Sequence, residues 1–192
     1  RGERDRPQVQ PQRAARAQAL LKEGKPETAV LLWDERLAQK PDDPEALDGR
    51  RQALTQQAQQ LHQRAAAVAS GDEADLSLLR SRLETLAQVD GLIHAGATAP
   101  EALEATRTSL TNKVRALIEA PLGLGQALEA KGRLSLLESA LRQAGLGPLA
   151  ADLAQQVERV GARRCLVLTN ATRTPWLGTA VARFCELFHM KG

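Results

Sequence analysis

The side chains best suited to covalent or metal chemistry in this chain are two cysteines and three histidines. A thiol becomes a nucleophile when a neighbouring imidazole takes its proton and a third group orients that imidazole. Cys165 or Cys185 could pair with His189 in this way, but the sequence offers no orienting group or oxyanion donor for either pair. We therefore assign no catalytic residues and predict that the protein is not an enzyme.

The two cysteines have a structural interpretation instead. Arg163–Asn170 is apolar and β-branched at its centre, and Arg173–Gly178 carries turn residues. Thr179–Phe188 alternates only in part and suits a second strand or a helix. We predict a C-terminal β-hairpin. In it Cys165 and Cys185 could form a disulfide, which implies an oxidising compartment; the alternative is two buried thiols that pack as small apolar groups.

Trp176 lies in the turn of the predicted hairpin, between Pro175 and Leu177. An exposed Trp is a common anchor in protein interfaces, so Trp176 is a candidate partner-binding residue. A buried Trp would instead hold the hairpin on the helices, because a lone hairpin is only marginally stable in water. Both interpretations stay open at this point.

Metal and phosphate sites are not indicated. His62 and His94 lie in helical patterns with no further His, Cys or carboxylate at ligand spacing. Gly123 and Gly125 separate two predicted helices, and a phosphate-binding loop would need a preceding strand and a following Lys-Ser or Lys-Thr pair. We expect no metal and no cofactor.

The composition favours a mainly α-helical protein. Leu and Ala dominate the 192 residues, aromatic residues make up only 2%, and the formal net charge is +3. Leu and Ala are strong helix formers that pack helices closely. The two signs of charge are mixed and no basic patch is interleaved with aromatics, so we expect no nucleic-acid binding. No apolar run reaches the roughly 18 residues of a bilayer span.

The rest of the chain is organised around the stretch 22–47, where turn residues and apolar spacing are clearest. Gly24 is placed to end one helix, because glycine adopts the left-handed conformation without strain. Pro26 suits the first turn of the next helix, and Pro41 stops it. Pro44 then begins a third helix. The apolar face of the second helix consists of Ala29, Val30, Trp33 and Leu37.

This order resembles the tetratricopeptide repeat (TPR), a 34-residue pair of helices. With Pro41 as the closing proline, the repeat covers residues 10–43. Ala17 and Ala29 then take the small positions where the two helices cross, and Trp33 takes the large apolar position. The departures from the family pattern are Arg13, Arg16 and Arg36. The alternative is an ordinary αα-hairpin with Pro and Gly at its ends.

Beyond the repeat, apolar spacing predicts antiparallel helices joined by short turns. An apolar residue every seventh position predicts one long helix over 44–70, ended at Ser70-Gly71, with Asp72 as the N-cap of the next. Further helices are expected over about 76–89, 100–120, 126–144 and 149–160. Their apolar faces include Leu47, Leu54, Leu61 and Val68 in the long helix, and Leu128, Leu134, Leu137 and Leu141 in the one over 126–144.

The predicted fold is a TPR-like helix-turn-helix followed by an antiparallel helical bundle and a small C-terminal β-hairpin. Its first residues, Arg1-Gly2-Glu3, lead us to expect a piece of a longer protein. The expected parts are a flexible arm over 1–12, the TPR-like unit and long helix over 13–69, the bundle over 70–160 and the hairpin over 161–192.

In TPR-like proteins the first helix of each repeat lines a groove for a peptide or helix, so the resemblance implies partner-binding positions at Ala14, Gln18 and Leu21. These differ from the Lys and Asn that clamp a C-terminal carboxylate. We expect a non-enzymatic scaffold that binds another protein and could form homo-oligomers through its helical seams. The alternative is an accessory region of a larger enzyme or envelope assembly whose functional domain begins near 161. A bacterial cell-envelope or periplasmic protein fits this picture, with the cytoplasm as second choice.

Overall fold

The computed structural model describes the backbone of residues 6–67 and 75–170, and the side chains of 12–67 and 75–162. Within these ranges the chain forms seven α-helices and no strand, so the mainly α fold class is confirmed. None of these helices combines the length and the apolarity that a membrane crossing requires. The helices are α1 (Arg6–Lys22), α2 (Pro26–Gln39), α3 (Pro44–Ala66), α4 (Leu76–His94), α5 (Leu103–Gly123), α6 (Ala127–Gln143) and α7 (Gly147–Asn170).

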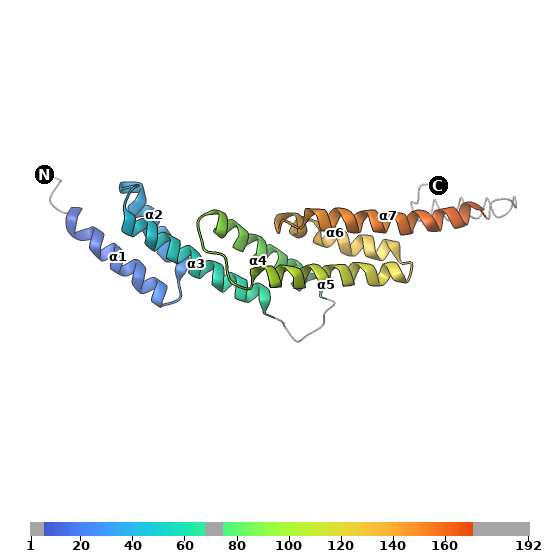
Figure 1. The fold of residues 1–192 in the computed structure, drawn as a ribbon, viewed down its shortest axis with the longest axis horizontal. Helices are drawn as coiled ribbons and strands as arrows, with labels where there is room; N and C mark the ends of the chain where they lie inside the picture. Colours follow the sequence, from blue (N-terminus) through green and yellow to red (C-terminus); the bar gives the residue numbers. More distant parts are fainter. Residues whose placement is uncertain (1–5, 68–74, 171–192) are drawn as a thin grey trace.

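The helices form an elongated array of antiparallel hairpins (Figure 1). Helices α1 and α2 pair at one end, α3 packs on α2 and pairs with α4, and α6 packs on α4, α5 and α7. The first helices of successive hairpins also touch, because α1 contacts α3, α3 contacts α5, and α5 contacts α7. The arrangement is that of a helical-repeat-like fold in which each hairpin is covered by the next.

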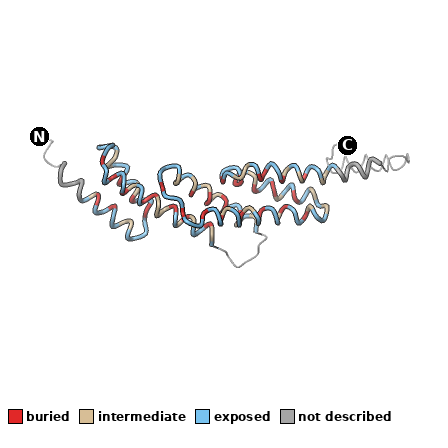
Figure 2. The backbone as a smooth tube through the Cα atoms, viewed as in Figure 1, coloured by how far each residue is buried: buried red, intermediate tan, exposed pale blue. Residues whose placement is uncertain are grey.

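Two apolar cores hold the array together, and their buried residues line the inner faces of the helices (Figure 2). The smaller core joins α1, α2 and the start of α3, whereas the larger one joins α3 through α7. Nearly all members of the larger core are Leu, Val, Ile or Ala, as the composition predicts. Its largest fully buried side chains are Leu83, Leu86, Ile118, Leu137, Leu141 and Leu153.

The smaller core is built around Trp33, which is only 1% exposed. Ala17 and Ala29 are fully buried beside it, so the prediction that small residues lie where α1 and α2 pack together is confirmed. Gly49 of α3 completes the site, because a Cβ there would stand 2.4 Å from Cε2 of Trp33. The indole of Trp33 therefore packs directly on the α3 backbone at position 49, where no side chain fits.

Glycine ends four of the helices in the same way. Gly24, Gly96, Gly125 and Gly145 all have positive φ angles, between 70° and 107°. In each turn the glycine N–H and the next N–H donate back to the last turn of the helix, as Lys25 does to the carbonyl of Leu20 at 2.9 Å. The predicted role of Gly24 as a helix terminator is confirmed.

Helix α1 begins at Arg6, so residues 6–12 of the predicted flexible arm are helical. Pro7 falls in the first turn, where a backbone N–H has no helical partner to lose. The remaining residues of that predicted arm, 1–5, lie outside the described residues.

Two predicted helix ends were misplaced. Asp75, and not Asp72, is the N-cap of α4: its carboxylate accepts hydrogen bonds from the backbone N–H groups of Ser77 and Leu78. The helix predicted over about 100–120 does not end there, because α5 continues through Pro121 to Gly123. In a regular helix the carbonyl of Leu117 would accept a hydrogen bond from the N–H of residue 121, which proline lacks. It accepts a 2.9 Å hydrogen bond from Arg133 of α6 instead.

Two predicted core leucines are exposed. Leu47 is 50% exposed, because the start of α3 packs on Trp33 through Ala46, Gly49 and Ala53 rather than through its heptad leucine. Leu128 is 64% exposed, because α6 buries the face that carries Leu134, Leu137 and Leu141. The other heptad leucines of α3, Leu54 and Leu61, are buried as predicted.

The predicted first strand of the C-terminal hairpin is wrong over residues 163–170, because α7 runs without a break from Gly147 to Asn170. Short apolar runs do not distinguish a strand from a buried helix end by periodicity alone. The remaining part of the predicted hairpin, 171–192, lies outside the described residues.

Candidate functional site

Helix α5 carries a strip of small, uncharged side chains on its exposed side. Its inner face buries Leu103, Leu110, Val114 and Ile118. Surface helices usually carry charged residues opposite such a core face. Here the exposed side also carries five small or neutral residues at helical spacing, flanked by Glu104 and Lys113. We call the five the α5 stripe: Ala105, Thr108, Ser109, Asn112 and Ala116.

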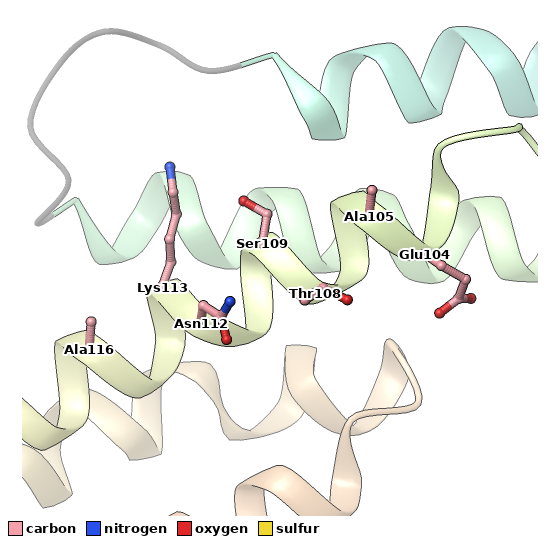
Figure 3. A pocket seen from close by; sticks show the side chains of 7 residues that line it. All are labelled: Glu104, Ala105, Thr108, Ser109, Asn112, Lys113 and Ala116. Atoms are coloured by element: carbon pink, nitrogen blue, oxygen red, sulfur yellow. The ribbon is translucent and has the colours of Figure 1, made fainter.

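The α5 stripe runs for about 17 Å along the helix, at a rise of about 1.5 Å per residue. Figure 3 shows that Ala105 and Ser109 point toward α3, together with the neighbouring Lys113. Because small side chains let a second helix axis approach closely, this face suits a helical segment of another molecule.

A small cleft, the α3–α5 cleft, adjoins the stripe. It has a volume of about 220 Å³ and lies between the end of α3, α4 and α5. Pockets for drug-sized ligands usually measure about 300–1,000 Å³, so the cleft is suited to one or two side chains. Its lining residues are Ala65, Ala66, Arg82, Ala105, Thr106, Ser109, Leu110 and Lys113.

The charged residues that line the α3–α5 cleft are both cations. Arg82 is only 9% exposed, and its Nη2 donates to the carbonyl of Ala67 at the end of α3. Lys113 is half-buried on the opposite wall. Among the described residues no carboxylate pairs with either side chain. The cleft therefore favours a carboxylate over a cation or a bare apolar group.

A hydrogen bond orders the wall of the cleft. His62 Nε2 of α3 lies 2.9 Å from Thr106 Oγ1 of α5, and both side chains are largely buried. This bond ties α3 to α5 next to Arg82. The other described histidine, His94, is exposed, and its Nδ1 lies 2.7 Å from the backbone oxygen of Asp90. In the described ranges no three His, Cys, Asp or Glu residues gather as metal ligands would.

The partner-binding positions predicted on α1 are not equally accessible. Ala14 is 5% exposed and packs in the smaller core. Gln18 is exposed and Leu21 is half-buried. Gln56 of α3 donates to the carbonyl of Leu21 at 3.1 Å, which closes the space between α1 and α3 at this point. Of the three predicted positions, Gln18 has the side chain that α1 exposes most fully.

The other predicted site residues lie at the C-terminal end. Cys165 lies in α7 and not in a strand. The predicted pairing of two strands, which would place Cys165 near Cys185, therefore lacks its first strand. Cys185 and Trp176 lie outside the described residues, and their predicted roles stay predictions.

The α5 stripe, Arg82 and Lys113 are not predicted from the sequence. The available signal was a lack of charge at positions 105, 108, 109, 112 and 116, on the face opposite the leucines. A search for apolar periodicity overlooks such a face because Ala, Ser, Thr and Asn neither mark a core nor form a motif. Arg82 and Lys113 are far apart in the chain, and only the packing of α4 and α5 brings them together.

Comparison of the chain with protein-family models, with curated proteins and with solved structures finds no match.

Proposed function

We propose that the protein is a non-enzymatic scaffold that binds a helical segment of another protein along the α5 stripe. The observation that carries this proposal is the stripe itself, a strip of five small or neutral residues about 17 Å long beside a cleft with two cations. A helix that lies on the stripe would place a carboxylate side chain in the α3–α5 cleft, near Arg82 and Lys113.

We further propose that the first hairpin is a TPR-like unit. Ala17, Ala29 and Trp33 are buried at the positions that the family pattern requires. The contacts from α1 to α3, from α3 to α5 and from α5 to α7 support the same proposal, because first helices line the groove in TPR-like arrays. The proposed site lies between two such first helices.

The alternative role, an accessory region for a domain that begins near residue 161, has less support. Helix α7 is continuous from Gly147 to Asn170 and contains no break at that position. A domain boundary usually lies in an exposed linker with few contacts across it.

Site-specific photocrosslinking tests the proposal. A photoreactive phenylalanine at Ser109 should crosslink one stoichiometric partner in extract from the protein's own source. The matched control places the same residue at Ser139, an exposed serine on α6. Ser109→Trp should abolish complex formation with the identified partner, whereas Ser139→Trp should leave it unchanged. Equal crosslinking from both positions, or no partner from Ser109, would contradict the proposal.

A further inference from the structure

The α3–α5 cleft offers more hydrogen-bond donors than one carboxylate can use. Three donor side chains line it: the guanidinium of Arg82 from α4 and, from α5, the ammonium of Lys113 and the hydroxyl of Ser109. A guanidinium has five N–H donors, and among the described residues Arg82 uses one of them, in its hydrogen bond to the carbonyl of Ala67. Its other four N–H groups have no acceptor within the described ranges.

The positive charge of the cleft is not balanced by its own lining. No carboxylate lines the cleft, and neither Arg82 nor Lys113 forms an ion pair with a described residue. The carboxylate that lines the surface of the α5 stripe is Glu104, nine residues before Lys113 and thus about 14 Å away along the helix axis. That separation exceeds the screening length of about 8 Å at physiological ionic strength. The cleft therefore presents two positive charges to a ligand.

A phosphate monoester matches these groups better than a carboxylate does. It carries a charge of about −1.5 to −2 at pH 7 and has three terminal acceptor oxygens. A carboxylate carries one charge and has two oxygens. With a phosphate, each of the three donor side chains can meet an oxygen, and both cations are neutralised. The cleft volume of about 220 Å³ admits one side chain that carries such a group.

The stripe gives a partner helix direct access to the cleft. Ala105, Ser109 and Lys113 line both the surface of the stripe and the cleft. Figure 3 shows these three side chains on the same side of α5, toward α3. A side chain that leaves the partner helix beside Ser109 therefore enters the cleft between the two cations.

We propose that the group recognised in the α3–α5 cleft is a phosphorylated side chain of the partner helix, so that phosphorylation of the partner strengthens its binding. This inference rests on the proposed function and replaces the carboxylate in it by a group of the same sign and higher charge. Arg82 supplies the directional hydrogen bonds, because a guanidinium can donate two parallel N–H bonds to one phosphate. Lys113 supplies the second charge.

The chemistry of the cleft can be tested without the partner. NMR titrations of the full chain with methyl phosphate and with acetate, at matched ionic strength and about pH 7.5, compare a dianion with a carboxylate. We expect methyl phosphate to bind at least about 10-fold more tightly. Lys113→Gln should weaken its binding at least about 10-fold, whereas Lys131→Gln, at an exposed lysine of α6, should leave it unchanged. Equal affinity for the two anions, or equal effects of the two variants, would overturn the inference.

Arg82→Lys separates hydrogen-bond geometry from charge. Lysine keeps the positive charge but lacks the planar fork, so the affinity for methyl phosphate should fall at least about 3-fold. Arg82 is buried and holds the end of α3. Circular dichroism therefore checks the fold of this variant, and the half-buried Lys113 decides the result if Arg82→Lys does not fold.

Phosphatase treatment tests the partner itself. A photoreactive phenylalanine at Asn112 lies on the stripe and leaves the residues that line the cleft intact. Its crosslinking to the partner, in extract from the protein's own source, should fall at least about 10-fold after the extract is treated with a protein phosphatase. Lys113→Gln should reduce crosslinking in untreated extract and have no further effect in treated extract.

The two proposals fail in different ways. A partner that crosslinks equally before and after phosphatase treatment would overturn this inference and leave the proposed function standing. No crosslinked partner in either extract would contradict the proposed function, and this inference with it.

Discussion

Gly49 of α3 lies directly against the indole of Trp33, so close that a Cβ on Gly49 would stand 2.4 Å from Cε2. Carbon atoms in contact are normally about 3.5–4.0 Å apart. The contact explains how the first hairpin is fixed to the second: the largest side chain of the smaller core fills a position that only glycine leaves open.

Gly49→Ala should therefore destabilise the protein even though alanine is the better helix former. Overpacking costs about 1–3 kcal/mol, and the gain in helix propensity is about 1 kcal/mol. We expect a net loss of up to about 2 kcal/mol in the free energy of unfolding, because the 2.4 Å approach places the cost toward the upper end of its range. Denaturant unfolding followed by circular dichroism measures it.

Gly91 is the matched control for that substitution. It lies inside α4, and a Cβ there would have no neighbour within 4 Å. Gly91→Ala should stabilise the protein by about 0.5–1 kcal/mol. An equal response at both glycines would show that the contact with Trp33 does not restrict position 49.

The local signals in the sequence predicted much of this fold, because each acts over only a few residues. Gly24 ends α1, Pro26 and Pro44 begin α2 and α3, and Trp33 is buried. Helix propensity and turn chemistry determine such features without reference to the rest of the chain. The α5 stripe and the pairing of Arg82 with the end of α3 depend on distant packing, which no short pattern encodes.

The predictions that were wrong also have physical causes that lie outside the short patterns. Leu47 and Leu128 fit apolar repeats, yet each is exposed because the neighbouring helix lies against another face. A seven-residue repeat also drifts around a straight helix, by about 20° for each heptad. Arg163–Asn170 was predicted as a strand from its apolar centre, but it continues an established helix. Continuing a helix avoids the cost of a new nucleus.

Arg133 compensates for Pro121, and this can be tested by a double-mutant cycle. Its Nη1 donates to the carbonyl of Leu117, which Pro121 leaves without a helical partner. Arg133→Met should lower the free energy of unfolding by about 1 kcal/mol, since that partly buried carbonyl then loses its hydrogen bond.

In the Pro121→Ala background the same substitution should cost less. The alanine introduced there supplies the N–H that the carbonyl of Leu117 lacks, so the two effects should couple by about 0.5–1 kcal/mol. The ion pair of Arg133 with Glu129 is lost in both backgrounds and cancels in the cycle. Strict additivity would mean that Arg133 stabilises the helices through the ion pair alone.

The ionisation of Asp43, the N-cap of α3, makes the stability of the junction between α2 and α3 depend on pH in the acid range. Burial raises the pKa of Asp43, but a 2.7 Å hydrogen bond from Arg36 and its positive charge outweigh this and hold the pKa below its ordinary value. A lowered pKa in the folded state means that the ionised carboxylate stabilises the fold. That contribution is complete above the ordinary pKa of about 3.9 and is lost as the pH falls through the folded-state pKa.

Arg36→Gln should raise the pKa of Asp43 toward its ordinary value and flatten the loss of stability below about pH 4. Asp75 serves as an internal reference. Hydrogen bonds from the side chain of Ser77 and from the backbone N–H groups of Leu78 and Ser77 also lower its pKa, and Arg36 takes no part in them. Unfolding at a series of pH values, with NMR titration of both carboxyl groups, should show a changed pKa for Asp43 and the same pKa for Asp75.

Arg107 joins three helices and should not be replaceable by lysine. From α5 its Nη2 contacts both carboxylate oxygens of Asp90 of α4, at 2.8 and 2.9 Å, and its Nη1 donates to the carbonyl of Ala144 at the end of α6, at 2.8 Å. Lysine keeps the charge but has no planar fork with which to reach both partners. We expect Arg107→Lys to lower the free energy of unfolding by about 1–2 kcal/mol.

Hydrogen exchange locates the effect of this substitution. Loss of the bond to Ala144 should increase exchange at the turn between α6 and α7, because that carbonyl then lacks a partner from α5. Arg115→Lys is the matched control: Arg115 is an exposed α5 arginine that lies 3.9 Å from Asp152 and should tolerate the change with less than about 0.5 kcal/mol of loss. If Arg107→Lys is equally harmless, the apolar contacts of α4, α5 and α6 alone determine how these helices pack.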